Sequence, residues 1–395
     1  MLSEIHQFKL PKTIIFGWSA AERVGEQAAK LGRRALLISG RGATKASGLQ
    51  GQIKGLLERA GLEVSVFDQV APEPAATTVD AAVAAIRESR AEVVVGIGGG
   101  SPLDTAKAAA GLAPLEGCCI EYLRGREIDR PGLPFIAIPT TAGTAAEITK
   151  NAVFLDEEQA VKLAARSDFW FPKVALVDPE LTLAMPPALT AACGMDALSH
   201  ALESYVSRRA HPASEALSAK AITLIGGALR RAFVDGADRQ VREDMMLGSM
   251  VAGMAFANVG CGAAHALGHV VGPAFGLSHG AACGLLLPYT LAFNMPACRE
   301  KSRDIAQLLS GRRRAEIAPE QAVELLLELL SDVGLPRSLT ELGGVEIALS
   351  SLIPGALLSG ALQSNPRPLN EVSLLKILQQ AFTGEPCFIL QAEEP

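Results

Sequence analysis

The second half of the sequence contains aspartate and histidine residues at the spacing of metal ligands. Asp196 and His200 are four residues apart in the segment ACGMDALSHALESY. His265 and His269 repeat this spacing, and His279 follows after a stretch that contains glycine and proline. Residues four apart lie on one face of a helix, and a carboxylate with two or three imidazoles binds divalent transition metals such as Fe²⁺ or Zn²⁺. The pattern predicts a metal site, but spacing alone leaves open which later histidines are ligands.

The three later histidines lie in an uncharged stretch. Residues 245–298 contain no Asp, Glu, Lys or Arg, and this length exceeds the about 20 apolar residues that span a bilayer. Glycines, prolines, Asn258 and the histidines interrupt the stretch, and such positions are costly in lipid. We therefore interpret it as the buried centre of a helical domain. A hydrogen-bonded core position explains any single histidine there, whereas the group as a whole favours metal coordination.

A glycine-rich segment in the first half has the form of a phosphate-binding turn. The segment VVVGIGGGSPLDTAKAAAG joins an apolar run to a helical pattern through Gly98, Gly99, Gly100 and Ser101. Glycines let backbone N–H groups approach a phosphate, and a helix N-terminus adds favourable partial charge. We expect Ser101 to cap the helix and Pro102 to lie in its first turn.

A second loop strengthens the prediction of a nucleotide site. The segment IPTTAGTAAEIT also follows a strand-like run and carries the hydroxyl groups of Thr140, Thr141 and Thr144. Ligands of open α/β sheets bind at the carboxyl ends of the strands. Together with Asp104, in the helix after the glycine turn, these residues predict a dinucleotide crevice. Tight packing is the alternative explanation for a glycine turn that stands alone.

The end of the second strand-like run bears on the choice between NAD and NADP. In many dinucleotide sites an acid at this position bonds the ribose 2′-hydroxyl and repels a 2′-phosphate. Here the chain has Gly40 followed by Arg41. The missing acid and the nearby guanidinium favour NADP over NAD. A solvated arginine in a glycine turn is the alternative.

The elements that must position these residues change character near Thr182. Before it, apolar runs typical of buried parallel strands occur at 34–39, 63–67, 92–97, 134–139 and 173–178, with helical patterns at 19–32, 48–61 and 77–89. After it, nearly all of the chain has helical patterns. We predict a doubly wound, Rossmann-like α/β domain in residues 1–182 and an all-helical domain in residues 183–395, with the active site in the cleft between them. Residues 151–171 are predicted to form a hairpin.

Composition excludes several classes of protein. A chain of 395 residues is too long for one ordinary core. The net charge of −6 and the lack of a dense Lys/Arg stripe argue against nucleic acid as a partner. Seven scattered cysteines without a C-x-x-C pair indicate reduced thiols in a cytoplasmic protein. The N-terminus shows no basic region followed by an apolar stretch, so we expect no signal peptide.

The sequence resembles the iron-containing (group III) alcohol dehydrogenases. The motifs that carry the resemblance run along almost the whole chain, in the order GGGSPLDTAKA, IPTTAGTAAEIT, VDPELT, GMDALSHALESY, HALGHVVGPAFGLSHG and NPRP. The resemblance implies a nicotinamide and one divalent metal in the cleft, with Fe²⁺ favoured over Zn²⁺. It assigns the metal to Asp196, His200, His265 and His279, and it gives His269 a part in proton transfer.

The same resemblance implies the residues around the cofactor and the substrate. It places Phe256 near the substrate, and it places cofactor contacts at Gly98, Gly99, Gly100, Ser101, Thr140, Thr141, Thr144, Lys162 and Leu181. The chain departs from the family pattern in two places. Gly40 stands where members that use NAD often have Asp, and Glu73 stands where many have Asn, which replaces a neutral donor by an anion.

These observations predict reversible oxidation of a small primary alcohol or diol to the aldehyde, with NADPH favouring the reductive direction. The metal would act as a Lewis acid and His269 would relay the proton. A dehydroquinate-synthase-like lyase and a maleylacetate-reductase-like oxidoreductase are the alternatives, but both need cations for an anionic substrate, and GMAFANVGCGAAHALGH is neutral and apolar. A non-enzymatic scaffold would require all these features to be structural. Because family members pair through N-terminal strands, we expect a homodimer that uses residues 9–17.

Overall fold

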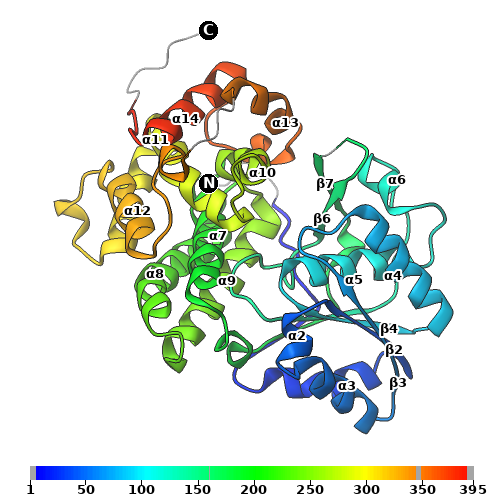
Figure 1. Cartoon of the computed structure of the whole chain (residues 1–395). Coiled ribbons are helices and arrows are strands. Elements are labelled where there is room, and N and C mark those ends of the chain that lie inside the picture. Colours follow the sequence, from blue (N-terminus) through cyan, green and yellow to red (C-terminus); the bar gives the residue numbers. More distant parts are fainter. Residues whose placement is uncertain (1–5, 160, 344–347, 389–395) are drawn as a thin grey trace. The chain divides into compact units, whose positions relative to one another are not determined.

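The computed structural model describes residues 6–159, 161–343 and 348–388 (Figure 1). The chain divides into two compact units. The first contains the described residues of 9–141 and 145–182, and the second contains those of 6–8, 142–144 and 183–388. The predicted fold class is confirmed, because the first unit contains a parallel sheet and the second is helical.

The first unit is built on a six-stranded parallel sheet with the order β1-β8-β5-β4-β2-β3. Its strands are β1 (Thr13–Phe16), β2 (Arg34–Gly40), β3 (Glu63–Val70), β4 (Val93–Gly98), β5 (Phe135–Pro139) and β8 (Val174–Val177). All five predicted runs therefore form strands. β4, β5 and β8 are buried along their whole length, as expected for parallel strands covered on both faces.

Alternate residues of β2 pack into two separate cores, one on each face of the sheet. Leu36 and Ile38 pack with residues of α4 (Ala76–Ser89) and α5 (Gly100–Leu112). Leu37 packs with residues of α1 (Val24–Ala29) and α3 (Leu49–Arg59). Successive side chains of a strand point to opposite faces, so the apolar run of β2 serves both layers. Figure 1 shows α3 on one side of the sheet and α4 and α5 on the other.

The strand order brings the predicted cofactor residues together at the carboxyl ends of neighbouring strands. β2 and β4 are neighbours with Ser39 opposite Ile97, and β4 and β5 are neighbours with Gly98 opposite Pro139. The chain passes from β2 outward to β3 and then returns to β4 on the other side of β2. Such a reversal of strand order leaves a crevice at the carboxyl ends of the strands, where ligands of this fold bind.

Short elements complete the first unit. β6 (Asn151–Asp156) and β7 (Val161–Arg166) form the predicted antiparallel hairpin. The others are α2 (Ala43–Ala46), α6 (Cys119–Leu123) and the 3₁₀ helices Ala20–Arg23, Asp168–Trp170 and Pro179–Thr182.

One expectation about the glycine turn is wrong. α5 begins at Gly100, and its N-cap is Gly99, which offers no side-chain cap. Ser101 lies inside the first turn, where its hydroxyl accepts a hydrogen bond of 3.3 Å from the backbone N–H of Glu73. The chain turns at Gly98, whose φ of +142° suits only glycine, and this turn starts the helix before Ser101. Pro102 lies in the first turn, as predicted.

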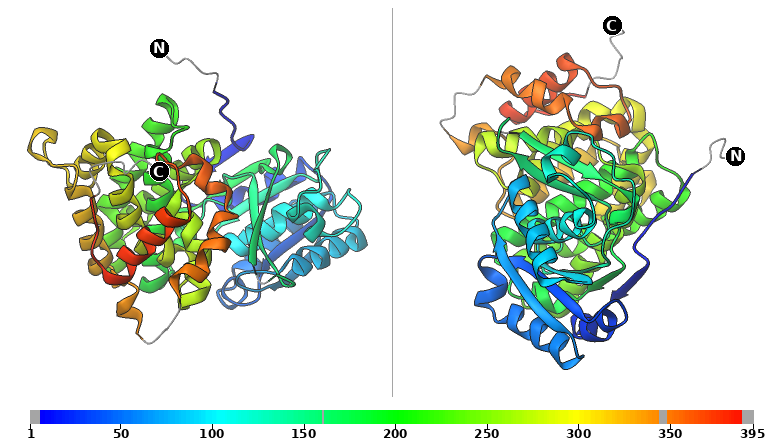
Figure 2. Two further views of the ribbon diagram at one scale, coloured as in Figure 1. Left: turned by 90° about the horizontal axis from the view of Figure 1, so that it is seen from above. Right: turned by 90° about the vertical axis from the view of Figure 1, so that its right-hand side faces the viewer.

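The second unit has no strand among its described residues and is formed by α7 (Pro187–Val206), α8 (Pro212–Val234), α9 (Arg239–Val259), α10 (Ala263–Phe275), α11 (His279–Ser310), α12 (Gln321–Asp332), α13 (Ile353–Leu357) and α14 (Glu371–Thr383) (Figure 2). Short 3₁₀ helices join several of them, at Arg314–Glu316, Thr340–Leu342, Leu349–Leu352 and Gly360–Ser364. α7 packs against α8, α9 and α11, so it lies at the centre of the unit.

The uncharged stretch 245–298 forms most of α9, all of α10 and the first part of α11. α11 is long and apolar enough to cross a membrane, and α9 with α10 passes the same test as a pair bent by 108°. However, 89% of the apolar window of α11 is buried inside the protein. Burial in the core of the helical unit therefore accounts for the apolar character of this helix, in line with our interpretation of the sequence.

Gly280 allows α11 to approach α7 closely. A Cβ at this position would lie 2.3 Å from the backbone oxygen of Ala192 and 2.9 Å from the Cβ of Asp196. Because a backbone oxygen cannot move aside as the end of a side chain can, we expect Gly280→Ala to lower the free energy of unfolding by about 1–3 kcal/mol. Urea denaturation measures this change.

A matched control for this substitution is Gly227→Ala in α8. Gly227 is exposed, and nothing lies within 4 Å of an added Cβ. Because alanine is the better helix former, this variant should be more stable than the parent by up to about 1 kcal/mol. The close approach of the two helices would be contradicted if both substitutions had the same effect.

Candidate active site

α7 carries two of the four predicted metal ligands in its buried centre. Asp196 and His200 lie one turn apart and are only 2% and 4% exposed. The helix begins at Pro187, which suits a first helical position, and continues for 20 residues. The predicted helix with both side chains on one face is therefore present.

α10 and α11 bring the other two predicted ligands to Asp196. His265 lies in the first turn of α10, and His279 is the first residue of α11. The Oδ1 atom of Asp196 lies 3.7 Å from Nε2 of His265 and 3.9 Å from Nε2 of His279. The ring of His200 stacks on that of His265 with a centroid distance of 4.4 Å. Asp196, His265 and His279 thus meet in one cluster, and the ring of His200 packs against it.

Three ligand-type atoms of this cluster have no hydrogen-bond partner among the described residues, although they are buried. They are Oδ1 of Asp196, Nδ1 of His200 and Nε2 of His265. A buried polar atom without a partner costs about 1–3 kcal/mol. A divalent cation bound among these atoms would remove this cost, so the donor set fits the metal that the sequence predicts.

The charge states of Asp196 and His200 also suit a metal. Burial alone would raise the pKa of Asp196, but the imidazoles of His200, His279 and His265 outweigh it and hold this pKa well below its ordinary range. Burial lowers the pKa of His200 to about 4, although Asp196 opposes the shift. At His265 burial lowers the pKa, but the neighbouring cysteines and carboxylates outweigh it and raise this pKa well above its ordinary value. At neutral pH the Asp196 carboxyl is therefore ionised and the His200 imidazole is neutral, which are the forms that bind metals.

The remaining predicted residues of the helical unit lie beside this cluster. The His269 ring, one turn after His265 on α10, is 5.1 Å from the His279 ring. Phe256, on α9, stacks on His200 at 4.5 Å with an interplanar angle of 14°. An aromatic ring and a further imidazole thus adjoin the four predicted ligands.

In the first unit, the two predicted nucleotide loops contact each other. The backbone N–H of Thr140 donates to the carbonyl oxygen of Gly98 at 2.9 Å. A Cβ on Gly99 would lie 3.5 Å from the side chain of Thr141, so the two loops are neighbours at the end of the sheet. Thr144 belongs to the helical unit.

Several predicted cofactor residues already have partners within the first unit. Asp104 pairs with the buried Lys107 at 3.3 Å and accepts a hydrogen bond of 3.1 Å from the backbone N–H of Val153, so it joins α5 to β6. Lys162 of β7 forms an ion pair of 2.5 Å with Glu73. The anion that replaces the usual Asn is therefore neutralised by a residue that was predicted to bind the cofactor.

The remaining predicted cofactor residues are Gly40 and Arg41, at the end of β2, and Leu181. Gly40 ends β2 beside α5, since a Cβ there would lie 3.5 Å from the ring of Pro102. The Nε of Arg41 donates to the backbone oxygen of Gln69 at 2.8 Å. Leu181, in the 3₁₀ helix Pro179–Thr182, packs against the core that contains α1 and α3.

Comparison with known proteins decides the family. The profile described as iron-containing alcohol dehydrogenase matches residues 11–179, and the profile of the C-terminal part of the Fe-containing alcohol dehydrogenase family matches residues 190–382. The chain belongs to the iron-containing alcohol dehydrogenase family. This membership confirms the resemblance inferred from the motifs.

Similar members of the iron-containing alcohol dehydrogenase family match this chain over nearly its whole length. Long-chain-alcohol dehydrogenase 1 of Geobacillus thermodenitrificans is 39% identical over 93% of this chain and 94% of its own. The 1,3-propanediol dehydrogenase of Klebsiella pneumoniae is 37% identical over 97% of this chain and all of its own. A crystal structure of a 1,3-propanediol oxidoreductase superposes with a TM-score of 0.91, at 38% identity, over 96% of this chain and 100% of that one.

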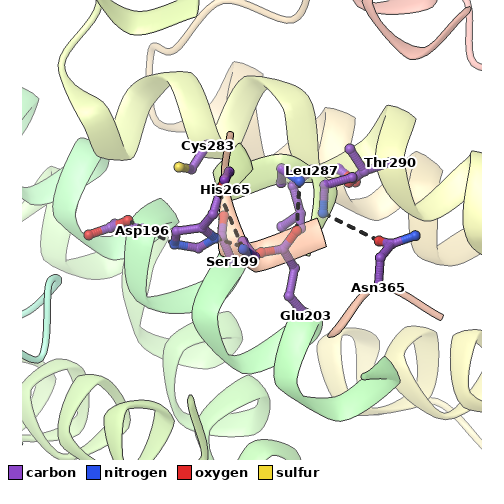
Figure 3. Close-up of polar contacts among 12 residues, drawn as sticks. Asp196, Ser199, Glu203, His265, Cys283, Leu287, Thr290 and Asn365 are labelled. Atoms are coloured by element: carbon purple, nitrogen blue, oxygen red, sulfur yellow. Dashed lines mark hydrogen bonds and ion pairs between the residues drawn. The ribbon is translucent and has the colours of Figure 1, made fainter. Parts of the chain in front are cut away.

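One buried acid beside the cluster of predicted ligands is not identified from the sequence. This acid is Glu203 on α7, whose Oε2 lies 2.5 Å from Nδ1 of His265 (Figure 3). Its Oε1 accepts a hydrogen bond of 2.7 Å from the backbone N–H of Ala264. Nδ1 therefore donates to the carboxylate, and Nε2 is left to face Asp196. The spacing of Asp196, His200 and Glu203, at i, i+4 and i+7 of one helix face, was the signal that could have revealed it.

The family motif NPRP anchors the start of α10. Oδ1 of Asn365 accepts hydrogen bonds from the backbone N–H of Ala263 at 3.3 Å and from Nδ2 of Asn294 at 3.0 Å. Nδ2 of Asn365 donates to Oδ1 of Asn294 at 2.8 Å and to the backbone oxygen of Arg367 at 2.7 Å. The motif thereby fixes the N-terminus of α10, two residues before His265, to α11.

Two cysteines near the cluster were also not predicted as site residues. Cys283 lies with Asp196, His265 and His279, and Cys261 lies with His200 and His265. The scattered positions of the cysteines indicate only reduced thiols. However, His279 and Cys283 have the same four-residue spacing as Asp196 and His200, which is the spacing of two ligands on one helix face.

The role of Glu203 can be tested by Glu203→Gln. The two hydrogen bonds from His265 and Ala264 reach different oxygens of the carboxylate, and glutamine replaces one of these oxygens by an NH₂ group, which donates and cannot accept. We expect metal affinity to fall about 10–100-fold, measured by titration with a competing chelator. Glu215→Gln, which removes a carboxylate that pairs with Lys301 on the outside of the helices, should leave the affinity unchanged. Equal affinity of Glu203→Gln and the parent would show that Glu203 does not support the metal.

Proposed function

We propose that this chain is a metal-dependent, NAD(P)-linked alcohol dehydrogenase and aldehyde reductase that transfers hydride between the nicotinamide and a small primary alcohol, diol or aldehyde. The observation that carries the proposal is the cluster of three buried ligand-type atoms without partners on Asp196, His200 and His265. The name of one relative, a 1,3-propanediol dehydrogenase, agrees with a small diol, and the name of another, a long-chain-alcohol dehydrogenase, agrees with an alcohol but not with a small one.

In this proposal Asp196, His200, His265 and His279 hold one divalent metal, with Fe²⁺ favoured and Zn²⁺ as the alternative. When bound, the metal supplies Lewis-acid polarisation of the alcohol oxygen. Glu203 holds His265 in the tautomer whose Nε2 faces Asp196. The part of α9 from Met245 onward and all of α10 carry no charged side chain, and such an apolar surround strengthens the electrostatic interactions within the site.

His269 is the proposed catalytic residue for proton transfer. The centroid of its ring lies 5.1 Å from that of His279, and the residue lies on α10, as His265 does. An imidazole nitrogen can act as a general base, so His269 can accept the alcohol proton, directly or through water, and pass it to solvent. Phe256, stacked on His200, supplies an apolar contact for the carbon chain of the substrate.

The cofactor is proposed to bind at the carboxyl ends of β2, β4 and β5. Backbone N–H groups of the glycine turn and the N-terminus of α5 suit a pyrophosphate. The proposed contacts are Gly98, Gly99, Gly100, Ser101, Asp104, Thr140, Thr141, Thr144, Lys162 and Leu181. Gly40 and Arg41 at the end of β2 favour NADP over NAD.

Further expectations complete the proposal. The domain limits are 1–182 and 183–395. A homodimer is supported by the position of β1 at one edge of the sheet, since an edge strand offers unpaired backbone groups to a partner. The cytoplasm as the location is supported by seven free cysteines. Neither nucleic acid nor a membrane is an expected partner.

The metal ligands can be separated from the proton relay by three substitutions. We expect His265→Ala and His279→Ala to lose both stoichiometric metal and turnover, because each removes a ligand. His269→Ala should keep the metal but lower kcat by about 10²–10⁴-fold, the usual contribution of general acid–base catalysis. Elemental analysis after anaerobic purification and initial rates with an alcohol panel measure both properties. Full metal content together with full turnover in His265→Ala would refute the proposed site.

The cofactor preference can be tested at the end of β2. We expect a higher kcat/KM with NADPH than with NADH, and Arg41→Ala should lower the NADPH value about tenfold or more, because a charge-assisted hydrogen bond to the 2′-phosphate is lost. The NADH value should change little. Gly40→Asp should shift the preference toward NADH by adding the missing acid. A parent enzyme that prefers NADH would contradict the proposed preference.

A further inference from the structure

A sulfur atom lies within the proposed metal cluster. Cys283 follows His279 by one turn of α11, and its Sγ is 3.6 Å from Nε2 of His279. Ligand atoms of Asp196, His265, His279 and Cys283 all lie within 4.8 Å of one another. Figure 3 shows Cys283 next to Asp196 and His265.

The separations of these atoms are close to those of a tetrahedral site. Metal–nitrogen and metal–oxygen bonds of about 2.0 Å and a metal–sulfur bond of about 2.3 Å place neighbouring ligand atoms of a tetrahedron about 3.3–3.5 Å apart. The three contacts described above, His279 with Cys283, His265 with Asp196 and His279 with Asp196, measure 3.6, 3.7 and 3.9 Å. Shifts of a few tenths of an ångström would bring these three contacts to tetrahedral values, and the other three separations are 4.8 Å or less.

The position of the sulfur is built into the packing of α10 against α11. A Cβ on Gly268 would lie 2.7 Å from Sγ of Cys283, so the glycine makes room for the sulfur. Cys283 is completely buried, and within the part of the chain that the structure describes the Oδ1 of Asp196 and the Nε2 of His265 beside it have no hydrogen-bond partner. These two orphan atoms point to a cation as the missing partner.

We propose that Cys283 is a metal ligand for a thiophilic divalent cation such as Zn²⁺ or Co²⁺. The site then consists of Asp196, His265, His279 and Cys283, and the thiol loses its proton to solvent when the cation binds. Cys283 takes the place that His200 has in the proposed iron site, and His200 keeps its stacking on His265. Thiolate ligands favour zinc over harder cations, so the identity of the metal decides between the two ligand sets.

This inference rests on the proposed function. Both ligand sets consist of four protein groups, so they differ in the sulfur and not in whether a position stays open for the substrate. The inference therefore concerns which residues hold the metal of the proposed enzyme, and its tests measure the ligands directly.

Cobalt substitution tests the sulfur ligand directly. The anaerobic, metal-free full-length protein is titrated with Co²⁺ alone, and its absorbance is recorded in the near ultraviolet, where thiolate-to-cobalt charge transfer appears. We expect a charge-transfer band that saturates at one equivalent, disappears in Cys283→Ser and persists in two controls. The first control is Cys261→Ser, the other cysteine near His265. The second is Cys298→Ser, a buried cysteine of the same helix whose thiol donates to the Asn294 backbone oxygen, as serine can.

The outcomes separate this inference from the proposed function. One equivalent of cobalt without the band, or a band that survives Cys283→Ser, would overturn the cysteine ligand and leave the metal site in place. A band lost in Cys261→Ser but not in Cys283→Ser would assign the sulfur to the other cysteine and also overturn it. Failure to bind any Co²⁺ would overturn both proposals.

A second measurement needs no substitution at Cys283. X-ray absorption at the zinc edge of the zinc-loaded parent protein should show one sulfur at about 2.3 Å. The spectrum of zinc-loaded Cys261→Ser should show the same sulfur ligand. A spectrum with only nitrogen and oxygen ligands would refute the proposal even if Cys283→Ser does not fold.

Discussion

The burial of Asp196 is the constraint on which the rest of the helical unit depends. An ionised carboxylate in an uncharged core is costly unless it is paired or bound to a cation. No Lys or Arg occurs in the stretch that surrounds it, and the side chains facing its Oδ1 are imidazoles. The proposed metal would resolve this arrangement, because it would supply the missing positive charge and also partner the nitrogen atoms that have no hydrogen-bond partner among the described residues. The same uncharged walls that make the carboxylate costly make a bound cation an effective Lewis acid.

Close helix packing is what brings the ligands to this carboxylate. Two glycines of α11, Gly280 and Gly284, face α7, and Cβ atoms on them would lie within 3 Å of Ala192 and Met195. α11 therefore lies close enough to α7 for His279 and Cys283 to reach Asp196. Glu203 and Asn365 then fix the first turn of α10, because they bind the ring of His265 and the backbone N–H groups of the two residues before it. The positions of the proposed metal ligands therefore depend on the packing of α7, α10 and α11 against one another.

Much of this arrangement could be predicted from the sequence, because its signals are local. The apolar runs of the sheet and the spacing of Asp196 and His200 depend on the periods of strand and helix. The cap of α5 could not be predicted in this way, because it follows from the positive φ of Gly98, which glycine permits but does not require.

The roles of Glu203 and Cys283 depend on contacts between helices distant in the sequence. Glu203 is a glutamate of α7 whose partner, His265, lies 62 residues further along the chain. Cys283 becomes a candidate ligand only because Gly268 of the neighbouring helix leaves space for its sulfur. Composition and spacing show that such residues exist, whereas packing decides what they face.

The most direct test of the central claim, that the buried cluster around Asp196 holds the catalytic metal, is anomalous X-ray diffraction from crystals grown anaerobically with Fe²⁺. Data recorded at the iron edge locate the ion without any assumption about its ligands. The account predicts one anomalous peak per chain, within bonding distance of Asp196, His200, His265 and His279. It would be contradicted by crystals that contain one iron per chain but show the peak elsewhere, with no anomalous signal in this cluster.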